Sequence, residues 1–221
     1  MKSSPLQVFP RGSNAVATAF LILLAGGIIA AILLAIILTS SHYAYDQNLT
    51  VEQPVPFSHK HHVSDDGIDC RYCHTSVMVS HFAGVPATHV CMTCHSQLWT
   101  NAEMLAPVRE SLKKNEPLRW QRVTSLPDYV YFNHSVHVQN GVGCESCHGR
   151  VDRMPLTEKR KPLTMQFCLA CHTNPAPQLR PPDEITTMGY EPAADALSGQ
   201  ELMAHYDIDT TGMTDCATCH R

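Results

Sequence analysis

The chain has 221 residues, of which 44% are hydrophobic and only 7% aromatic, and its formal net charge at pH 7 is -4. The negative charge argues against a nucleic-acid-binding role, because proteins of that class carry a basic surface. Much of the apolar content lies in one amino-terminal block and the prolines number 15, so little remains for a protein-only core.

The amino-terminal block, residues 15–38, reads "AVATAFLILLAGGIIAAILLAIIL" and contains no charged residue. As a helix it is about 36 Å long, enough to cross a hydrocarbon core of about 30 Å. Lys2 and Arg11 precede it, whereas the first charges after it are Asp46 and Glu52. The positive-inside rule therefore predicts that residues 1–14 are cytoplasmic, and that everything after the span lies on the periplasmic or outer side of the inner membrane.

A cleaved signal peptide is the alternative for this block. Its apolar region typically runs for about 7 to 15 residues and ends at small residues, whereas "TSSHYAYD" offers no clean Ala-x-Ala site. We therefore expect an uncleaved single-pass anchor. Gly27, Ala31 and Ala35 recur at four-residue spacing, which favours packing against transmembrane helices of partner subunits.

All ten cysteines fall within five copies of Cys-x-x-Cys-His, the attachment signature of c-type haem. In this signature the two thiols bond covalently to the porphyrin, and the adjoining histidine is the proximal iron ligand. The sequence therefore predicts five haem c groups. The predicted attachment residues are Cys70, Cys73, Cys91, Cys94, Cys144, Cys147, Cys168, Cys171, Cys216 and Cys219, and the predicted proximal ligands are His74, His95, His148, His172 and His220.

Zinc and disulfides are the alternatives for these cysteines. A zinc ribbon gives no reason for a histidine directly after every second cysteine. Cys-x-x-Cys pairs rarely form structural disulfides, and a disulfide framework would not repeat one local spacing five times. No cysteine is left over as a thiol nucleophile.

A second pattern, Phe-x-His-x-x-His, precedes the first and third haem signatures, as "FSHKHHV" and "FNHSVHV". It marks an internal repeat of two haems per unit, with a first unit at residues 57–131 and a second at 132–172. A six-coordinate iron needs a second axial ligand, so each unit needs two. We assign His59 to the haem of His74, His62 to that of His95, His134 to that of His148, and His137 to that of His172.

The fifth haem needs its own distal ligand. His205 lies 11 residues before Cys216, the same interval that separates His59 from Cys70, and is our first candidate. A methionine is the alternative, since Met165 and Met154 lie just ahead of the fourth haem signature.

The remaining chain wraps and links these sites. Residues 39–56 form a linker after the anchor, and residues 173–221 form an extended segment that carries the fifth haem. Thr100 and Glu103 have capping-box spacing, which predicts a helix over residues 101–114. The Pro- and Gly-rich run from Asn174 is expected to lie extended over a surface. The predicted fold is therefore a multihaem cytochrome c, mostly coil with short helices around five haems, plus one transmembrane helix.

The Phe-x-His-x-x-His and Cys-x-x-Cys-His pattern resembles class III multihaem cytochromes of the c3 and c7 type. With "QVFPRGSNA", "AGVPATHVCMTCHSQLW", "RWQRVTSLPDYVYFNHSVHV", "CESCHGRVDRM" and "LTMQFCLACH", the chain is similar to the pentahaem cytochrome c subunit of bacterial alternative complex III, a quinol oxidoreductase. The resemblance implies a subunit that takes electrons from an iron-sulfur subunit and passes them to a monohaem cytochrome c subunit. It implies contact with menaquinol only through those partners.

The sequence is compatible with three functions. The first is an electron-transfer subunit in which both axial positions of every iron are filled, with no catalytic residue of its own. The second is a multihaem enzyme that reduces a small oxyanion, which requires an iron with an open position. The third is a quinol dehydrogenase that acts alone through a membrane-proximal haem. The near match between distal histidines and haems favours the first.

Overall fold

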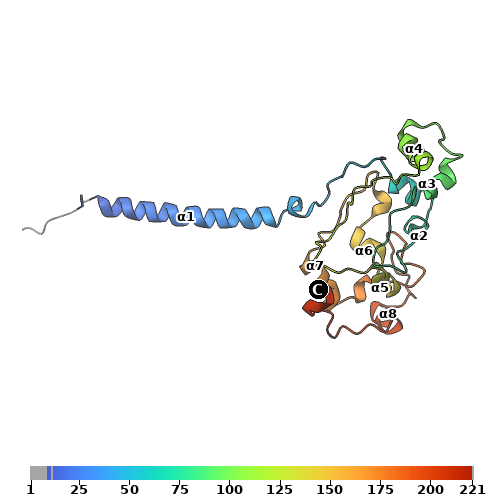
Figure 1. The fold of residues 1–221 in the computed structure, drawn as a ribbon. Coiled ribbons are helices and arrows are strands. Elements are labelled where there is room, and N and C mark those ends of the chain that lie inside the picture. Colours follow the sequence, from blue (N-terminus) through green and yellow to red (C-terminus); the bar gives the residue numbers. More distant parts are fainter. Residues whose placement is uncertain (1–8, 11, 221) are drawn as a thin grey trace, which may run out of the picture. The chain divides into compact units, whose positions relative to one another are not determined.

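The structure is a computed structural model that describes residues 9, 10 and 12–220 (Figure 1). The chain divides into two compact units, Met1–Tyr45 and Asp46–Arg221. The predicted cytoplasmic segment, residues 1–14, lies mostly outside the described residues.

The first unit consists chiefly of one helix, α1 (Ser13–Thr39), which contains 27 residues and no acidic or basic side chain. At about 1.5 Å per residue it is about 40 Å long, so its length and composition suffice to cross a bilayer. Helices of this kind near an amino terminus occur both as membrane anchors and as signal sequences. A short 3₁₀ turn, η1 (His42–Tyr45), follows it.

The second unit consists of short helices joined by long irregular segments (Figure 1). Within the described residues its β-structure is limited to isolated bridges, such as those that join Gln47 to Lys159 and Val142 to Leu179. The elements are η2 (Lys60–Asp65), α2 (Cys70–Cys73), α3 (Thr88–His95), η3 (Glu103–Leu105), α4 (Ala106–Lys114), α5 (His134–Gln139), α6 (Cys144–His148), η4 (Val151–Arg153), α7 (Met165–Thr173), η5 (Ala176–Gln178), α8 (Gly199–His205) and α9 (Cys216–Cys219).

Every Cys-x-x-Cys-His signature coincides with a helix. Helices α2, α6 and α9 begin at the first cysteine, whereas α3 and α7 begin three residues earlier. Residues three and four apart share one helix face, so this local structure turns the two thiols and the imidazole in the same direction. Side-chain caps start two of these helices: Asp69 accepts from the Arg71 amide at 2.8 Å, and Thr164 accepts from the Phe167 amide at 3.3 Å.

The two Phe-x-His-x-x-His segments fold differently. His134 and His137 lie on α5, an α-helix whose cap Asn133 accepts a hydrogen bond from the Ser135 amide. His62 lies on η2, which is a π-helix, and His59 is its N-cap residue. The wider turn of the π-helix changes the angle between residues three apart, so the two repeats do not present their histidines alike.

The protein-only core is small, as the composition predicts. Among the described residues, a cluster of buried side chains contains Val77, Val138 and Ile185, against which Met78, Ala83 and Cys144 pack. Among the described residues, no large side chain is less than 2% exposed. The prediction of short helices in a mostly irregular chain is confirmed, and such a chain needs its prosthetic groups to fill the interior.

The structure corrects the start of one predicted linking helix and the predicted course of one linking segment. The helix expected over residues 101–114 is a 3₁₀ turn, η3, followed by α4, which starts at Ala106 because Pro107 favours a helix start; Thr100 caps neither. The segment after Asn174 does not merely cover a surface, because it contributes core residues. Ala176, Leu179, Arg180 and Ile185 are all at most 9% exposed.

Arg180 anchors this segment. Its amide donates to the Gly141 carbonyl at 2.8 Å, its guanidinium contacts the Glu145 carboxylate at 3.3 Å, and its carbonyl accepts from the Tyr206 hydroxyl at 2.7 Å. These polar contacts pair the buried charge with a carboxylate and tie α6 to the segment. A Pro-rich run can therefore be fixed in the core without regular secondary structure.

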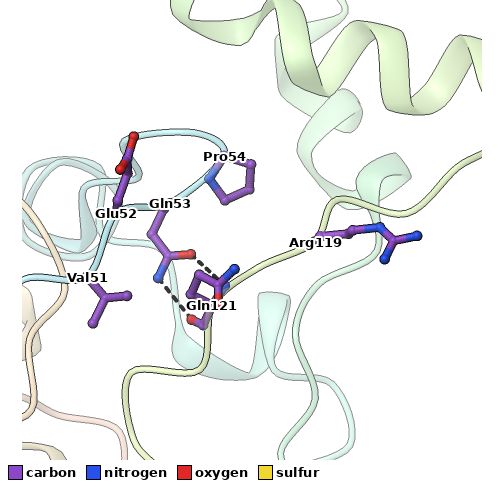
Figure 2. A pocket seen from close by; sticks show the side chains of 6 residues that line it. All are labelled: Val51, Glu52, Gln53, Pro54, Arg119 and Gln121. Atoms are coloured by element: carbon purple, nitrogen blue, oxygen red, sulfur yellow. Dashed lines mark hydrogen bonds between the residues drawn. The ribbon is translucent and has the colours of Figure 1, made fainter.

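A shallow hollow lies where the linker after the anchor meets the loop after α4 (Figure 2). The Gln53 side chain faces Gln121 there: its amide nitrogen donates to the Gln121 carbonyl, and its oxygen accepts from the Gln121 amide, both at 2.9 Å. This reciprocal pair fixes the linker against the loop after α4. The hollow is lined by Val51, Glu52, Gln53, Pro54, Arg119 and Gln121, none of which is a predicted haem ligand.

Candidate haem-binding sites

Three of the predicted proximal histidines lie opposite the distal histidine that the repeat assigns to them. The ring centres of His134 and His148 are 6.3 Å apart. Those of His137 and His172 are 6.1 Å apart, and those of His62 and His95 are also 6.1 Å apart. The histidines of each pair come from separate segments of the chain, so the tertiary fold brings them together.

These separations fit an iron between the two rings. Two imidazoles that bind one metal ion through bonds of about 2 Å have ring centres a little over 6 Å apart. A direct hydrogen bond between the rings would bring them closer. The residues present therefore fit a haem held between two histidines at each of these three positions.

The hydrogen bonds of the imidazoles use Nδ1, so that Nε2 can bind a metal. Nδ1 of His74 contacts the Gly84 carbonyl at 2.7 Å, and Nδ1 of His172 contacts the Met213 carbonyl at 2.7 Å. A carbonyl accepts only from a protonated nitrogen, which places the free electron pair on Nε2 and fixes the ring orientation. The same Nδ1-to-carbonyl contact is made by His62, His95, His134, His137 and His220.

His59 is held by a side chain instead. Its Nδ1 lies 2.9 Å from the Thr157 hydroxyl oxygen, a residue 98 positions later in the chain. Sequence reasoning missed Thr157, and no local motif marks it. Burial, with the neighbouring His74, His62 and His148, lowers the pKa of His59 to about 4. His74, its assigned partner, is thus among its electrostatic neighbours.

Partial burial favours the neutral form of these histidines, which is the form that binds a metal. Burial, with the neighbouring His134 and His74, lowers the pKa of His148 to about 4. Burial also lowers the pKa of His137, and His172 and His134 contribute. The desolvated charge would be costly, so the imidazoles keep an electron pair available at neutral pH.

None of the ten cysteines, all of them among the described residues, forms a disulfide. Burial raises the pKa of the Cys147 thiol to about 11, and the neighbouring Cys171 and Cys168 add to the shift. Burial likewise raises the pKa of Cys73, with contributions from Cys91, Cys70 and Cys94. Thiols from different motifs therefore lie near one another.

The fifth site is different. His205 is the last residue of α8, is exposed, and packs its ring on Tyr206 with 4.9 Å between centres. Within the described part of the chain, no histidine ring faces His220 as His134 faces His148; the Tyr129 ring lies 5.8 Å from it. The structure does not bring His205 and His220 together, and His205 as a ligand stays a prediction.

The two methionine alternatives lie in different places. Met154 is 2% exposed, and its carbonyl accepts from the Lys60 amide at the start of η2. Met165 begins α7 and is 67% exposed. His61, which the repeat leaves over, contacts two carboxylates instead, with Nδ1 3.8 Å from Asp65 and Nε2 3.5 Å from Asp66.

Comparisons with known proteins show the family of the chain. A family model described as cytochrome c7 and related cytochrome c matches residues 130–221, which contain the third, fourth and fifth motifs. The chain is also 32% identical, over 170 residues, to the protein named "Menaquinone reductase, multiheme cytochrome c subunit" of Nitratidesulfovibrio vulgaris strain Hildenborough. The match covers 76% of this chain and 68% of that relative.

The family assignment rests on the extent of this match. The helices at the Cys-x-x-Cys-His motifs and the paired histidines are consistent with it. The chain belongs to the family of multihaem c-type cytochrome subunits that includes the menaquinone reductase subunit.

Proposed function

We propose that this protein is a membrane-anchored pentahaem cytochrome that transfers electrons within a quinol-oxidising complex, as the subunit of alternative complex III that it resembles does. The observation that carries the proposal is the pairing of histidine rings about 6 Å apart, each pair including the histidine of a Cys-x-x-Cys-His motif. A relative named as a subunit of a menaquinone reductase supports the link to quinone.

In this proposal the chain's residues hold five haems. The ten motif cysteines attach them, and the motif histidines are the proximal ligands. His59, His62, His134 and His137 are the distal ligands of the first four. When bound, haem supplies reversible one-electron chemistry at iron.

The residues around the histidines support electron transfer by holding the imidazole rings in fixed orientations. Carbonyl acceptors such as Gly84 and Met213 orient the rings and raise their basicity as ligands. Two protein ligands on an iron exclude substrate from it, so the first four sites favour electron transfer over catalysis on a small molecule.

The proposed topology places α1 in the inner membrane and Asp46–Arg221 on the periplasmic side. The proposed partners are an iron-sulfur subunit as electron donor, a monohaem cytochrome c subunit as acceptor, and partner transmembrane helices beside α1. Menaquinol reacts at the partners rather than at this chain. The resemblance to alternative complex III supports these partners, and the apolar, uncharged length of α1 supports the anchor.

Affinity purification of the tagged chain from its own membranes tests the proposal. We expect an iron-sulfur protein and a monohaem cytochrome to co-purify, and the haems of the complex to be reduced when a menaquinol analogue is added. The chain stripped of its partners should carry five haems by intact mass and should stay oxidised with the same quinol. Reduction of the isolated chain would instead support a quinol dehydrogenase that acts alone.

A further inference from the structure

The helix of the first motif, α2, lies between those of the second and third motifs. Toward the second, the Tyr72 hydroxyl of α2 lies 2.8 Å from the Thr93 hydroxyl of α3. Toward the third, α2 and α6 bind the same dipeptide. Thr186 donates from its hydroxyl to the Asp69 carboxylate at 2.8 Å, and the Cys144 amide donates to the neighbouring Ile185 carbonyl at 3.0 Å.

The thiols of α2 follow the same division. The Cys73 thiol interacts electrostatically with Cys91 and Cys94 of α3, whereas the Cys70 thiol interacts with Cys144 of α6. The two cysteines of the first motif thus have two different neighbouring motifs. The loop after α2 adds a second link to the third motif, because the His81 carbonyl accepts from both the amide and Nδ1 of His134.

The second motif lies near the first. Its other packing partner is α4, a helix that carries no predicted haem ligand. Helix α3 packs on α4, where the hydroxyls of Thr88 and Ser111 are 2.7 Å apart. The distal histidine assigned to α3, His62, comes from η2, whose N-cap His59 is assigned to the first motif. The Tyr72–Thr93 contact and the shared element η2 therefore both connect the second motif to the first.

The third, fourth and fifth motifs follow in chain order. One short helix, α5, carries His134 opposite His148 and His137 opposite His172, so the third and fourth sites share it. The fourth site joins the fifth through the Nδ1 of His172, which contacts the carbonyl of Met213, three residues before Cys216. The Cys168 thiol of the fourth motif also interacts with Cys219 of the fifth.

We infer that the five haem sites form one unbranched row in the order His95, His74, His148, His172, His220, with the second motif of the chain at one end and the fifth at the other. This inference rests on the proposed binding of haem. If the sites followed the order of the motifs in the sequence, the row would begin with His74 instead of His95.

The exposure of the cysteines is independent support. Of the ten, only Cys94 and Cys216 are exposed, and they belong to the two sites at the ends of the row; the other eight are partly buried. Redox partners therefore reach the chain at these two sites. Each one-electron oxidation of a donor at one end is balanced by the one-electron reduction of an acceptor at the other, with no bond made or broken.

Locating the irons in the holoprotein within its complex tests the order without any substitution. Either iron anomalous diffraction or a cryo-electron-microscopy map would serve. We expect the shortest iron-to-iron distances to join His95 to His74, His74 to His148, His148 to His172, and His172 to His220. If the His95 iron is instead nearest to the His148 or His172 iron, or if one iron has three near neighbours, the row is wrong.

A pair of variants tests the functional consequence. Cys70→Ala with Cys73→Ala removes an inner site and should isolate the His95 haem, which then drops out of the rapid phase of electron exchange after flash reduction. Cys91→Ala with Cys94→Ala removes an end site and should leave the four remaining haems in one rapid phase. The opposite pattern would overturn the order. A wild-type mass with fewer than five haems would count against the proposed function instead, and the iron positions decide the order if either variant does not fold.

Discussion

The imidazoles of His134 and His148 lie almost parallel, with 6° between their planes and 6.3 Å between their centres. The rings of His62 and His95 are separated by nearly the same distance but are inclined at 68°. The two repeats thus set the same pair of ligands at different angles, because one distal histidine lies on an α-helix and the other on a π-helix.

This difference predicts two kinds of ferric spectrum in one protein. Parallel imidazoles interact with the same iron d orbital and separate the orbital energies, whereas inclined imidazoles leave them closer together. We expect a rhombic low-spin electron paramagnetic resonance signal from the His148 haem and a strongly anisotropic one from the His95 haem. His134→Met should remove the first and His62→Met the second. Loss of the same signal in both variants would contradict the assignment.

The distal positions can be tested with carbon monoxide. His134→Ala removes the ring opposite His148, so the reduced variant should bind carbon monoxide at one haem more than the wild type. His205→Ala is the matched comparison for the fifth site, where the His205 ring packs on Tyr206. If His205 is the fifth distal ligand, this variant should also bind carbon monoxide at one additional haem, and an unchanged count would remove His205 from the ligand list.

A glycine near Arg180 should be sensitive to substitution. Gly141 has a φ of +79°, and a Cβ there would lie 2.2 Å from the Tyr206 ring. Gly67 has a similar φ of +69° with open space around it. Gly67→Ala should cost about 1 kcal/mol of unfolding free energy for backbone strain alone. Gly141→Ala should cost about 3 kcal/mol, since the Tyr206 ring must move as well. Denaturant unfolding of the holoprotein measures both, and equal losses would show that the Tyr206 contact is unimportant.

Asp69 should contribute a pH-dependent part of the stability. Its carboxylate caps α2 and binds the Arg71 guanidinium at 2.8 Å, and the hydrogen bond from Arg71 lowers its pKa from 3.8 to about 2. A depressed pKa stabilises the fold above the unfolded value and loses that effect as the pH falls. We expect Asp69→Asn, which keeps the cap, to lose less than about 1 kcal/mol at pH 7, since the pair is largely exposed.

The difference between wild type and Asp69→Asn should disappear as the pH falls from 3.8 to about 2. Asp69→Ala should lose about 1 kcal/mol more, because the cap is lost too. Asp215→Ala is the control, since Asp215 precedes α9 without a side-chain cap bond. A gap between wild type and Asp69→Asn that widens in acid would contradict the assigned sign.

Membrane attachment through α1 predicts a strong effect of charge at its centre. Leu24→Lys with Ile28→Lys introduces two charges, each of which costs about 3 kcal/mol at the middle of a membrane helix. We expect this variant to be lost from carbonate-washed membranes. Ser40→Lys with Ser41→Lys places the same charges after the helix and should be retained. A mature wild-type chain that lacks residues before Asp46 would identify α1 as a signal sequence instead.

The sequence predicts local structure here better than long-range structure. Short helices in a mostly irregular chain and the end of α4 at Lys114 were expected, because both depend on composition and on neighbouring residues. The pairs His134–His148 and His137–His172 were also expected, because an internal repeat implies repeated geometry. The start of α4 was misplaced because a proline at the first turn prevailed over a capping pattern.

The features that could not be predicted depend on contacts between distant residues. Thr157 reaches His59 across 98 positions, and Ile185 enters the core from a Pro-rich run that resembles a surface segment by composition. The position of α2 between α3 and α6 follows from Tyr72, Asp69 and Thr186, none of which belongs to a recognisable motif. Such contacts are consequences of the complete fold.

The small core has a consequence for the life of this protein in the cell. With a buried cluster as small as Val77, Val138 and Ile185 among the described residues, the polypeptide has too little apolar area to become compact before its cysteines are modified. Haem attachment is then a step of folding rather than an addition to a finished domain. When a cell is short of iron, unmodified chains remain open to proteases, so the amount of this polypeptide should follow the supply of haem.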